Sequence, residues 1–241
     1  MHYNASISCQ YHRGYESAHR MVLLSRGFRQ QFLDYARITD GSKLRFIPNM
    51  LSFSAFLSET EIPHKEKIVL VVARLEETQK RISHILRIWQ QIEQSSGNKD
   101  WTLHIVGHGM DEARYYRLVR QLGLQRVTFH GRQNPEPYYR RASLFMMTSR
   151  SEGWGLTLTE SQQMGVVPLA YDSYSSLRDI ITDGYNGFII PDTDINTYAS
   201  RMLELMNNDE LRRKIACQAI ESAHRFEPAT VADKWVKVIE E

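Results

Sequence analysis

The stretch IVLVVARLEETQKRISHILRIWQQI, residues 68–92, places a strand pattern directly before a helix pattern. Residues 68–74, IVLVVAR, form a continuous apolar and largely β-branched run bounded by polar residues, which is typical of a strand buried on both faces of a sheet. Apolar side chains then recur at spacings of three and four, so that they share one face of a helix: Ile82, Ile85, Leu86, Trp89 and Ile92. The stretch therefore predicts one β–α unit of a layered fold.

The same alternation continues through the rest of the chain. Strand patterns follow at 103–107, 127–131, 144–149, 166–171 and 187–190. Helix patterns lie between them at 111–122, 135–141 and 156–164, and after them at about 194–206, 209–224 and 229–239. Alternating units of this kind form a parallel sheet with helices on both faces. We predict an α/β fold, a Rossmann-like doubly wound parallel sheet followed by C-terminal helices.

Residues 1–50 do not follow this alternation. They begin with polar, His- and Tyr-rich sequence, continue with a short apolar segment at 21–25, and predict a helix that ends at about residue 35. Too few strand patterns are present for an independent domain. We expect a short N-terminal stub at 1–50, a linker at 51–66 and one domain at 67–241.

The composition excludes several classes of protein. With 241 residues, of which 42% are hydrophobic and 24% charged, the chain has the profile of a globular protein. Its 30 Lys and Arg residues balance 28 Asp and Glu residues to a formal net charge of +2, so we expect no nucleic-acid partner. Cys9 and Cys217 have no partner motif, and no apolar run approaches the ~20 residues of a membrane helix, so we expect a cytoplasmic protein.

The residues that follow the predicted strands are the candidates for a binding site, because ligands of open parallel sheets bind at the carboxyl ends of the strands. After the fourth strand of the sheet, Gly153 and Gly155 allow a close approach of backbone to ligand, and the next helix presents free N–H groups to an anion. Glu152 in this loop and Glu160 in the helix could reach different hydroxyl groups of one extended ligand. A diphosphate with a sugar at each end has that shape.

Five motifs stand in order along residues 68–190 and carry a family resemblance. They are VVARL and QKR within 71–81, HIVGHG at 104–109, VTFHG at 127–131, TSRSEGWGLTLTESQQMGVVPLAY at 148–171 and DGYNGFII at 183–190. Together they resemble the C-terminal, nucleotide-sugar donor-binding domain of retaining glycosyltransferases with the GT-B fold, family 4, also called glycosyl transferases group 1.

The resemblance implies a role for each matching residue. Arg74 and Lys80 would hold the diphosphate of a UDP-, GDP- or ADP-sugar, and Glu152 would bind hydroxyl groups of the transferred sugar; these three form the catalytic set. Glu160 would bind the ribose hydroxyls. The remaining nucleotide contacts, mostly through backbone, would come from Gly107, Gly131, Arg132, Gly153, Trp154, Gly155 and Leu156. The resemblance implies no metal and no cofactor, because cations and a helix end stabilise the leaving group.

The sequence also departs from the family pattern. The usual glycine before Arg74 is Ala73, and a stretch that usually reads Gly-Gly-x-x-Glu is Ser175-Ser176-Leu177-Arg178-Asp179, which places the donor-sugar contacts in question. Full members carry an N-terminal acceptor domain, of which only the end is apparent, at 21–33 and 43–51. Residues 1–50 are thus expected to be the remnant of that domain, whose main part would be a separate domain or subunit.

The expected function is transfer of a sugar, with retention of configuration, to a glycan or lipid-linked glycan. We expect the chain alone to be weakly active or inactive. The alternative is a nucleotide-sugar-binding module or one subunit of a split transferase. An epimerase or phosphorylase would need groups for which no motif is present, and a dehydrogenase is disfavoured because the first strand is not followed by a G-x-G-x-x-G turn.

Other readings of the same residues stay open in the sequence. Glu152 could be a solvated loop carboxylate. Lys80 could be a surface helix residue, the first of two adjacent cations with Arg81. The segment 192–194 resembles a metal-binding Asp-x-Asp motif. It also suits a helix that begins after it and is N-capped by Asp194. One helix face carries three arginines that suit either peripheral contact with acidic lipids at the inner face of a membrane or a solvated surface: Arg114, Arg117 and Arg120.

Overall fold

The computed structural model describes residues 14–241, and its centre is a six-stranded, entirely parallel sheet. The strands lie in the order β5-β4-β3-β6-β7-β8. Their bounds are β3 Ile68–Val72, β4 Thr102–Val106, β5 Val127–Phe129, β6 Leu144–Met147, β7 Val167–Tyr171 and β8 Phe188–Ile190. In the register, Val69 of β3 lies opposite Leu103 of β4 and Leu144 of β6. The predicted Rossmann-like α/β fold is confirmed.

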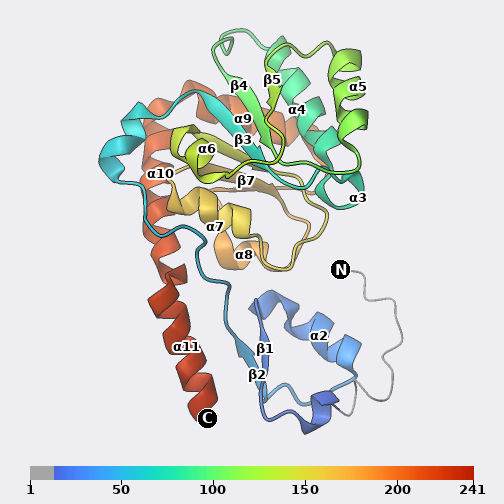
Figure 1. Cartoon of the computed structure of the whole chain (residues 1–241), viewed down its shortest axis with the longest axis vertical. Coiled ribbons are helices and arrows are strands. Elements are labelled where there is room, and N and C mark those ends of the chain that lie inside the picture. Colours follow the sequence, from blue (N-terminus) through green and yellow to red (C-terminus); the bar gives the residue numbers. More distant parts are fainter. Residues whose placement is uncertain (1–13) are drawn as a thin grey trace.

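Helices cover both faces of this sheet (Figure 1). Helix α4 packs against α5 and α9, and α7 packs against α10. The predicted apolar face of α4 is buried, with Ile88 in addition. The helices are α3 Glu77–Lys80, α4 Ile82–Gln94, α5 Glu112–Leu122, α6 Glu136–Arg141, α7 Leu156–Gln163, α8 Leu177–Ile180, α9 Ile195–Asn207, α10 Asp209–Ala223 and α11 Pro228–Glu240, with a short 3-10 turn η3 at His224–Phe226.

The N-terminal part forms a small unit of its own below the sheet in Figure 1. It consists of β1 Met21–Leu23, the 3-10 turn η1 Arg26–Phe28, α2 Arg29–Ala36 and β2 Leu44–Phe46. The strands β1 and β2 pair in parallel, and a small apolar cluster beneath them contains Met21, Leu33 and Leu44. The helix that the sequence predicts to end near residue 35 is therefore present, split into η1 and α2.

Three connections hold the N-terminal unit to the larger domain. The Asp179 carboxylate accepts hydrogen bonds from the Ser25 hydroxyl, at 2.5 Å, and from the Arg26 N–H, at 3.1 Å. Helix α11 runs down beside the unit (Figure 1), and Glu241, the residue after its end, pairs with Arg20 and Arg45. The third connection is the chain itself, which enters the larger domain at 51–66. Apolar residues of that segment are buried in the main core: Leu51, Leu57 and Ile62.

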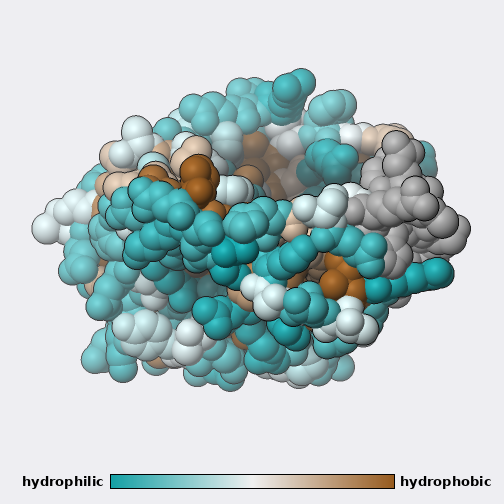
Figure 2. All heavy atoms as spheres, turned by 90° about the horizontal axis from the view of Figure 1, so that it is seen from below, coloured by the Kyte–Doolittle hydropathy of each residue, from teal (hydrophilic) through white to brown (hydrophobic). Residues whose placement is uncertain are grey.

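The face of the molecule that carries α11 and the N-terminal unit is mainly hydrophilic. Seen from the end where α11 and the N-terminal unit lie, it is largely teal with scattered brown atoms (Figure 2). None of the helices within residues 14–241 is long and apolar enough to span a membrane. Cys217 is a free, partly buried thiol, whereas Cys9 lies outside the described residues.

Candidate active site

The order of the strands creates a crevice at their carboxyl ends. From β3 the chain proceeds outward to β4 and β5, whereas from β6 it proceeds outward in the other direction to β7 and β8, so the two directions part between β3 and β6. Ligands of such sheets bind at this point. A cavity of about 640 Å³ lies beside it. Its lining includes five residues of the predicted site or adjoining it: Arg74, Lys80, Gly107, Arg132 and Thr157.

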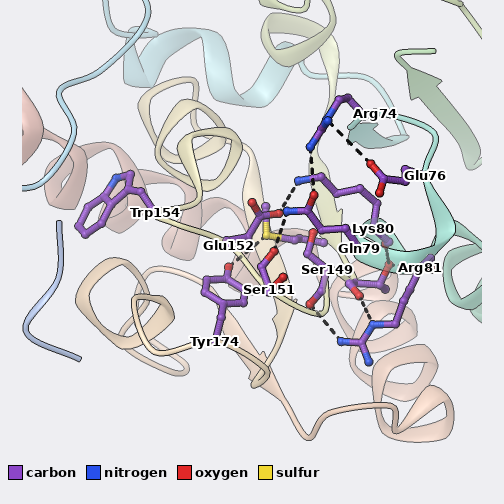
Figure 3. Close-up of polar contacts among 12 residues, drawn as sticks. Arg74, Glu76, Gln79, Lys80, Arg81, Ser149, Ser151, Glu152, Trp154 and Tyr174 are labelled. Carbon is purple, nitrogen blue, oxygen red and sulfur yellow. Dashed lines mark hydrogen bonds and ion pairs between the residues drawn. The ribbon is translucent and has the colours of Figure 1, made fainter. Parts of the chain in front are cut away.

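The centre of the site is a pair of oppositely charged side chains. The Nζ atom of Lys80, at the end of α3, lies 2.5 Å from the Oε1 atom of Glu152, in the loop after β6 (Figure 3). The two side chains are only 15% and 12% exposed. The structure thus brings together two members of the predicted catalytic set, and it places Lys80 inside the crevice rather than on the surface.

Arg74 is linked to the loop before Glu152 through a glutamine, Gln79, for which the sequence assigns no role. The Arg74 guanidinium is exposed and donates to the Gln79 side-chain oxygen at 3.0 Å, and the Gln79 amide donates to the Ser151 carbonyl at 3.0 Å (Figure 3). The half-buried Glu76 carboxylate lies 3.8 Å from the Arg74 guanidinium. Gln79 therefore links Arg74, after β3, to the loop after β6. In the sequence, only its place within the QKR motif could have indicated that it belongs to the site.

Two glycine-containing loops border the 640 Å³ cavity, which is lined by Gly107 of the first loop and by Arg132 of the second. Gly107 has a φ of +138°, and a Cβ atom there would lie 1.9 Å from the Ala73 carbonyl oxygen, so only glycine fits. Its N–H donates to the Gly131 carbonyl at 2.8 Å and is not free for a ligand. Gly131 has a φ of +66° with open space around it, and the next residue, Arg132, is exposed. The first loop is thus fixed by packing and the second is open.

The glycine-rich loop leads into α7 as the sequence predicts. Gly155 has a φ of +109°, and α7 begins at Leu156 without a side-chain cap, so its first N–H groups are available to an anion. Trp154 is different, because its side chain is buried edge-on against Phe226 and lies away from Glu152 (Figure 3). Gly153 has open space around it. Any ligand contact from Trp154 would therefore be through its backbone.

Glu160 lies deeper than Glu152. It is 9% exposed, and its Oε2 atom accepts a hydrogen bond from the Tyr139 hydroxyl at 3.1 Å. Burial raises the pKa of Glu160, while hydrogen bonds from Ser52 and Tyr139 to the carboxylate oppose that rise. Glu160 sits behind Thr157, which lines the cavity. The structure thus brings Glu152 to the crevice. Glu160 is buried in α7, one helical turn after Thr157.

The segment that departs from the family pattern packs on the N-terminal unit. The Ser176 hydroxyl donates to the Trp154 carbonyl, and Ser175 approaches Gly27 so closely that a Cβ atom on Gly27 would lie 2.3 Å from the Ser175 carbonyl oxygen. A second cavity, of about 490 Å³, lies at this contact. It is lined by Phe28 and Gln31 of the N-terminal unit and by Arg150, Ser151, Glu152, Ser173, Tyr174, Ser175 and Asp192.

The aspartates of the segment 192–194 have structural partners. Asp194 caps α9 by accepting from the Thr197 N–H at 2.9 Å, as one of the two sequence interpretations predicts. Asp192 pairs with Arg81 at 2.8 Å. Across residues 14–241, no group of three or more His, Cys, Asp or Glu side chains is arranged to hold a metal ion. The three arginines of α5 are exposed.

The chain is similar to bacterial sugar transferases in sequence. It is 25% identical over 178 residues to the amylovoran biosynthesis glycosyltransferase AmsD of Erwinia amylovora, which covers 73% of this chain and 48% of that protein. It is also 25% identical over 198 residues to the poly(ribitol-phosphate) alpha-N-acetylglucosaminyltransferase of Staphylococcus aureus, covering 80% of this chain and 40% of that protein. The chain therefore spans about half, or less, of the length of these relatives.

Solved structures show the same fold. A crystal structure of S. aureus TarM in complex with Fondaparinux, alpha-GlcNAc-glycerol and UDP superimposes with a TM-score of 0.80 at 23% identity, covering 95% of this chain and 45% of that one. The lipopolysaccharide outer core galactosyltransferase WaaB gives a TM-score of 0.71 at 23% identity, covering 92% and 62%. These are glycosyltransferases of the GT-B fold. Because a model of the glycosyl transferases group 1 family matches residues 53–222, well over half of the chain, this protein belongs to that family.

Proposed function

We propose that this chain is the C-terminal, donor-binding domain of a retaining family 4 glycosyltransferase, which transfers a hexosyl group from a nucleoside diphosphate sugar to a glycan or lipid-linked glycan. The observation that supports this most is the contact between Lys80 and Glu152 beside the 640 Å³ cavity. One strand end supplies a cation suited to phosphate, and the neighbouring strand end supplies a carboxylate suited to sugar hydroxyl groups.

In this proposal the donor lies along the carboxyl ends of the strands. The diphosphate contacts Arg74, Lys80 and the first N–H groups of α7, whereas the nucleoside extends through the cavity toward Arg132 and the neighbouring Gly131. Glu152 then accepts hydrogen bonds from hydroxyl groups of the transferred sugar. The ribose would reach Glu160 past Thr157, which requires that the carboxylate exchange or share its contact with Tyr139.

The same groups supply the chemistry. When the bond between the anomeric carbon and the diphosphate oxygen breaks, negative charge grows on the diphosphate. Arg74, Lys80 and the positive end of α7 stabilise that charge, so we propose that transfer requires no metal and no cofactor. The acceptor hydroxyl attacks from the face on which the nucleotide departs and passes its proton to the departing diphosphate, so the product keeps its configuration.

The acceptor side would come mainly from elsewhere. We propose that residues 1–50 are the remnant of an acceptor domain, that 51–66 are the linker and that 67–241 are the donor domain. The separate small sheet and apolar cluster of the N-terminal unit support this division. Because acceptor positioning would then lie largely outside the chain, we expect the purified chain to transfer little sugar.

A second candidate is a nucleotide-sugar-binding module or one subunit of a split transferase. The observation in its favour is that Lys80 and Glu152 lie together beside the 640 Å³ cavity, which suits binding of a nucleotide sugar whether or not transfer follows. In either case we propose a cytoplasmic location. We also propose that the exposed arginines of α5 make peripheral contact with the inner face of a membrane.

Calorimetric titration tests the nucleotide site directly. UDP, GDP, ADP and NAD are each added in the presence of EDTA, and we expect one nucleoside diphosphate to bind. Binding of NAD alone would overturn the proposal. Glu160→Ala should weaken nucleotide binding by about 1–3 kcal/mol, the usual cost of leaving a buried polar partner unpaired. The control is Glu204→Ala, which removes an exposed carboxylate from α9 and should leave the affinity unchanged.

The second test is transfer itself. The purified chain is incubated with a UDP-sugar and the release of UDP is followed with and without added acceptor glycans. We expect nucleotide binding with little turnover. Rapid transfer by the isolated chain would show that the acceptor site is complete and would refute the proposed division of the chain.

A further inference from the structure

Arg81, the residue after Lys80, is held in an unusual backbone conformation. Its φ is +49° and its ψ is +46°, which is the left-handed region that residues other than glycine rarely adopt, at a cost of about 1–2 kcal/mol. Its side chain is nevertheless long, charged and only 11% exposed. Contacts of the side chain must therefore stabilise this conformation.

The guanidinium of Arg81 contacts residues at the ends of three other strands, β6, β7 and β8. Its Nε atom donates to the Thr148 carbonyl at 2.9 Å, and one terminal nitrogen donates to the Ser149 carbonyl at 3.0 Å and to the Asp192 carboxylate at 2.8 Å. The group also lies over the Tyr171 ring, 5.4 Å from its centre. Arg81 thus joins the loop after β3 to the loops after β6 and β8.

Thr148 returns these contacts. Its hydroxyl is within hydrogen-bonding distance of the Lys80 carbonyl, at 2.9 Å, and of the Arg81 carbonyl, at 3.1 Å. The N–H of Arg150 donates to the Gln79 carbonyl at 2.7 Å. The segments 79–81 and 148–151 are therefore hydrogen-bonded along their length. Lys80 belongs to the first segment, and Glu152 directly follows the second.

We propose that Arg81 is a positioning residue, which fixes the Lys80 ammonium and the loop before Glu152 at the separation that the donor requires. The guanidinium is turned away from the Lys80 ammonium, so it would act through the backbone and not by contact with the diphosphate (Figure 3). The effect on nucleotide binding rests on the proposed function. The effect on the position of Lys80 does not.

Three substitutions separate positioning from plain stabilisation of the fold. Arg81→Gly relieves the left-handed backbone and removes the guanidinium, while Arg81→Lys keeps the charge but loses the planar fork that bonds two carbonyls. The matched control is Arg126→Lys. Arg126 also bonds two main-chain carbonyls, of Asn98 and Trp101, and lies over the Trp89 ring, but it is at the opposite end of the strands.

Two measurements are made on each variant. The first is the NMR signal of Lys80 after reductive ¹³C-methylation of the lysines, assigned with Lys80→Arg. The second is the affinity for UDP, measured also in a Lys80→Met background. We expect both Arg81 variants to move the Lys80 signal toward those of exposed lysines and to weaken UDP binding about tenfold, an effect that largely disappears without Lys80.

The control should lower the unfolding free energy but leave the Lys80 signal and the UDP affinity unchanged. An unchanged Lys80 signal in Arg81→Gly would overturn the proposal, and so would an equal loss of UDP affinity with and without Lys80. If the unsubstituted chain binds no nucleotide, the proposed function fails, while the Lys80 signal still decides whether Arg81 positions that side chain. If Arg81→Gly does not fold, Arg81→Lys decides in the same way.

Discussion

Substituting Glu152 by Gln should make nucleoside diphosphates bind more tightly. In the free protein the Lys80 ammonium is neutralised by Glu152 at 2.5 Å, and both side chains are shielded from solvent. A diphosphate that binds Lys80 must compete with this carboxylate and is repelled by it. Glutamine keeps the shape and a hydrogen-bond acceptor but removes the negative charge.

The magnitude follows from the geometry. At the effective dielectric constant of a protein surface, two unit charges in contact interact by on the order of 4 kcal/mol. Water and the remaining amide contact offset much of this, so we expect about one third of it, ~1.4 kcal/mol, or an affinity for UDP about tenfold higher. A UDP-sugar should gain less, because its sugar loses a charged acceptor for its hydroxyl groups.

Calorimetry with UDP and a UDP-sugar provides the assay. Glu76→Gln serves as the matched control, because Glu76 lies in the same crevice but forms only a loose, partly exposed pair with Arg74, worth at most about 1 kcal/mol. The gain from Glu152→Gln should also vanish in a Lys80→Met background. An unchanged or weaker affinity for UDP in Glu152→Gln would refute the assignment of Lys80 to the diphosphate.

Three further predictions concern the fold around the site. The Lys65 ammonium donates to the carbonyls of Tyr139, Arg140 and Ala142, and burial lowers its pKa from 10.5 to about 7. Between pH 7 and 10.5 the unfolded chain holds one more proton than the folded one, so the unfolding free energy should rise with pH by up to about 1.4 kcal/mol per pH unit. Urea titrations at pH 7 and 9 measure this rise, and Lys65→Met should lack it. Gly107→Ala should lower the unfolding free energy by more than ~2 kcal/mol, because the added methyl group meets the Ala73 carbonyl. The control is Gly123→Ala, also at positive φ but in open space, which should lower it by about 1 kcal/mol. Equal losses in the two variants would contradict the packing argument. Tyr139→Phe removes a hydrogen bond to the Glu160 carboxylate and should raise the pKa of Glu160 further, as followed by ¹³C NMR of the carboxyl group; a lower pKa would show that the hydroxyl is not its partner.

The sheet and the approximate place of the site were predictable because both depend on local patterns. An apolar run such as 68–73 and the spacing of residues in α4 can be recognised within one segment. Parallel strands then place all their carboxyl ends at one edge, so Lys80 and Glu152 fall together without any knowledge of the intervening chain.

The rest depends on contacts between distant segments. The left-handed conformation of Arg81 is stabilised by carbonyls some 67 residues further along the chain, and no spacing in the sequence indicates them. The depth of Glu160 likewise results from Ser52 and Tyr139, which come from two other segments. Asp179 was recognisable as a departure from the family pattern, but its partner, Ser25, lies 154 positions away.

The pairing of β3 with β6 has a consequence for the kinetics of the protein. The residues that pair, such as Val69 and Leu144, are separated in the sequence by β4 and β5, so the crevice between β3 and β6 belongs to the non-local contacts that slow folding. A nucleotide bound at Lys80 and Glu152 recognises only the completed sheet. It would add to the barrier against unfolding while leaving the rate of folding nearly unchanged, and so would lengthen the lifetime of the folded molecule without hastening its formation.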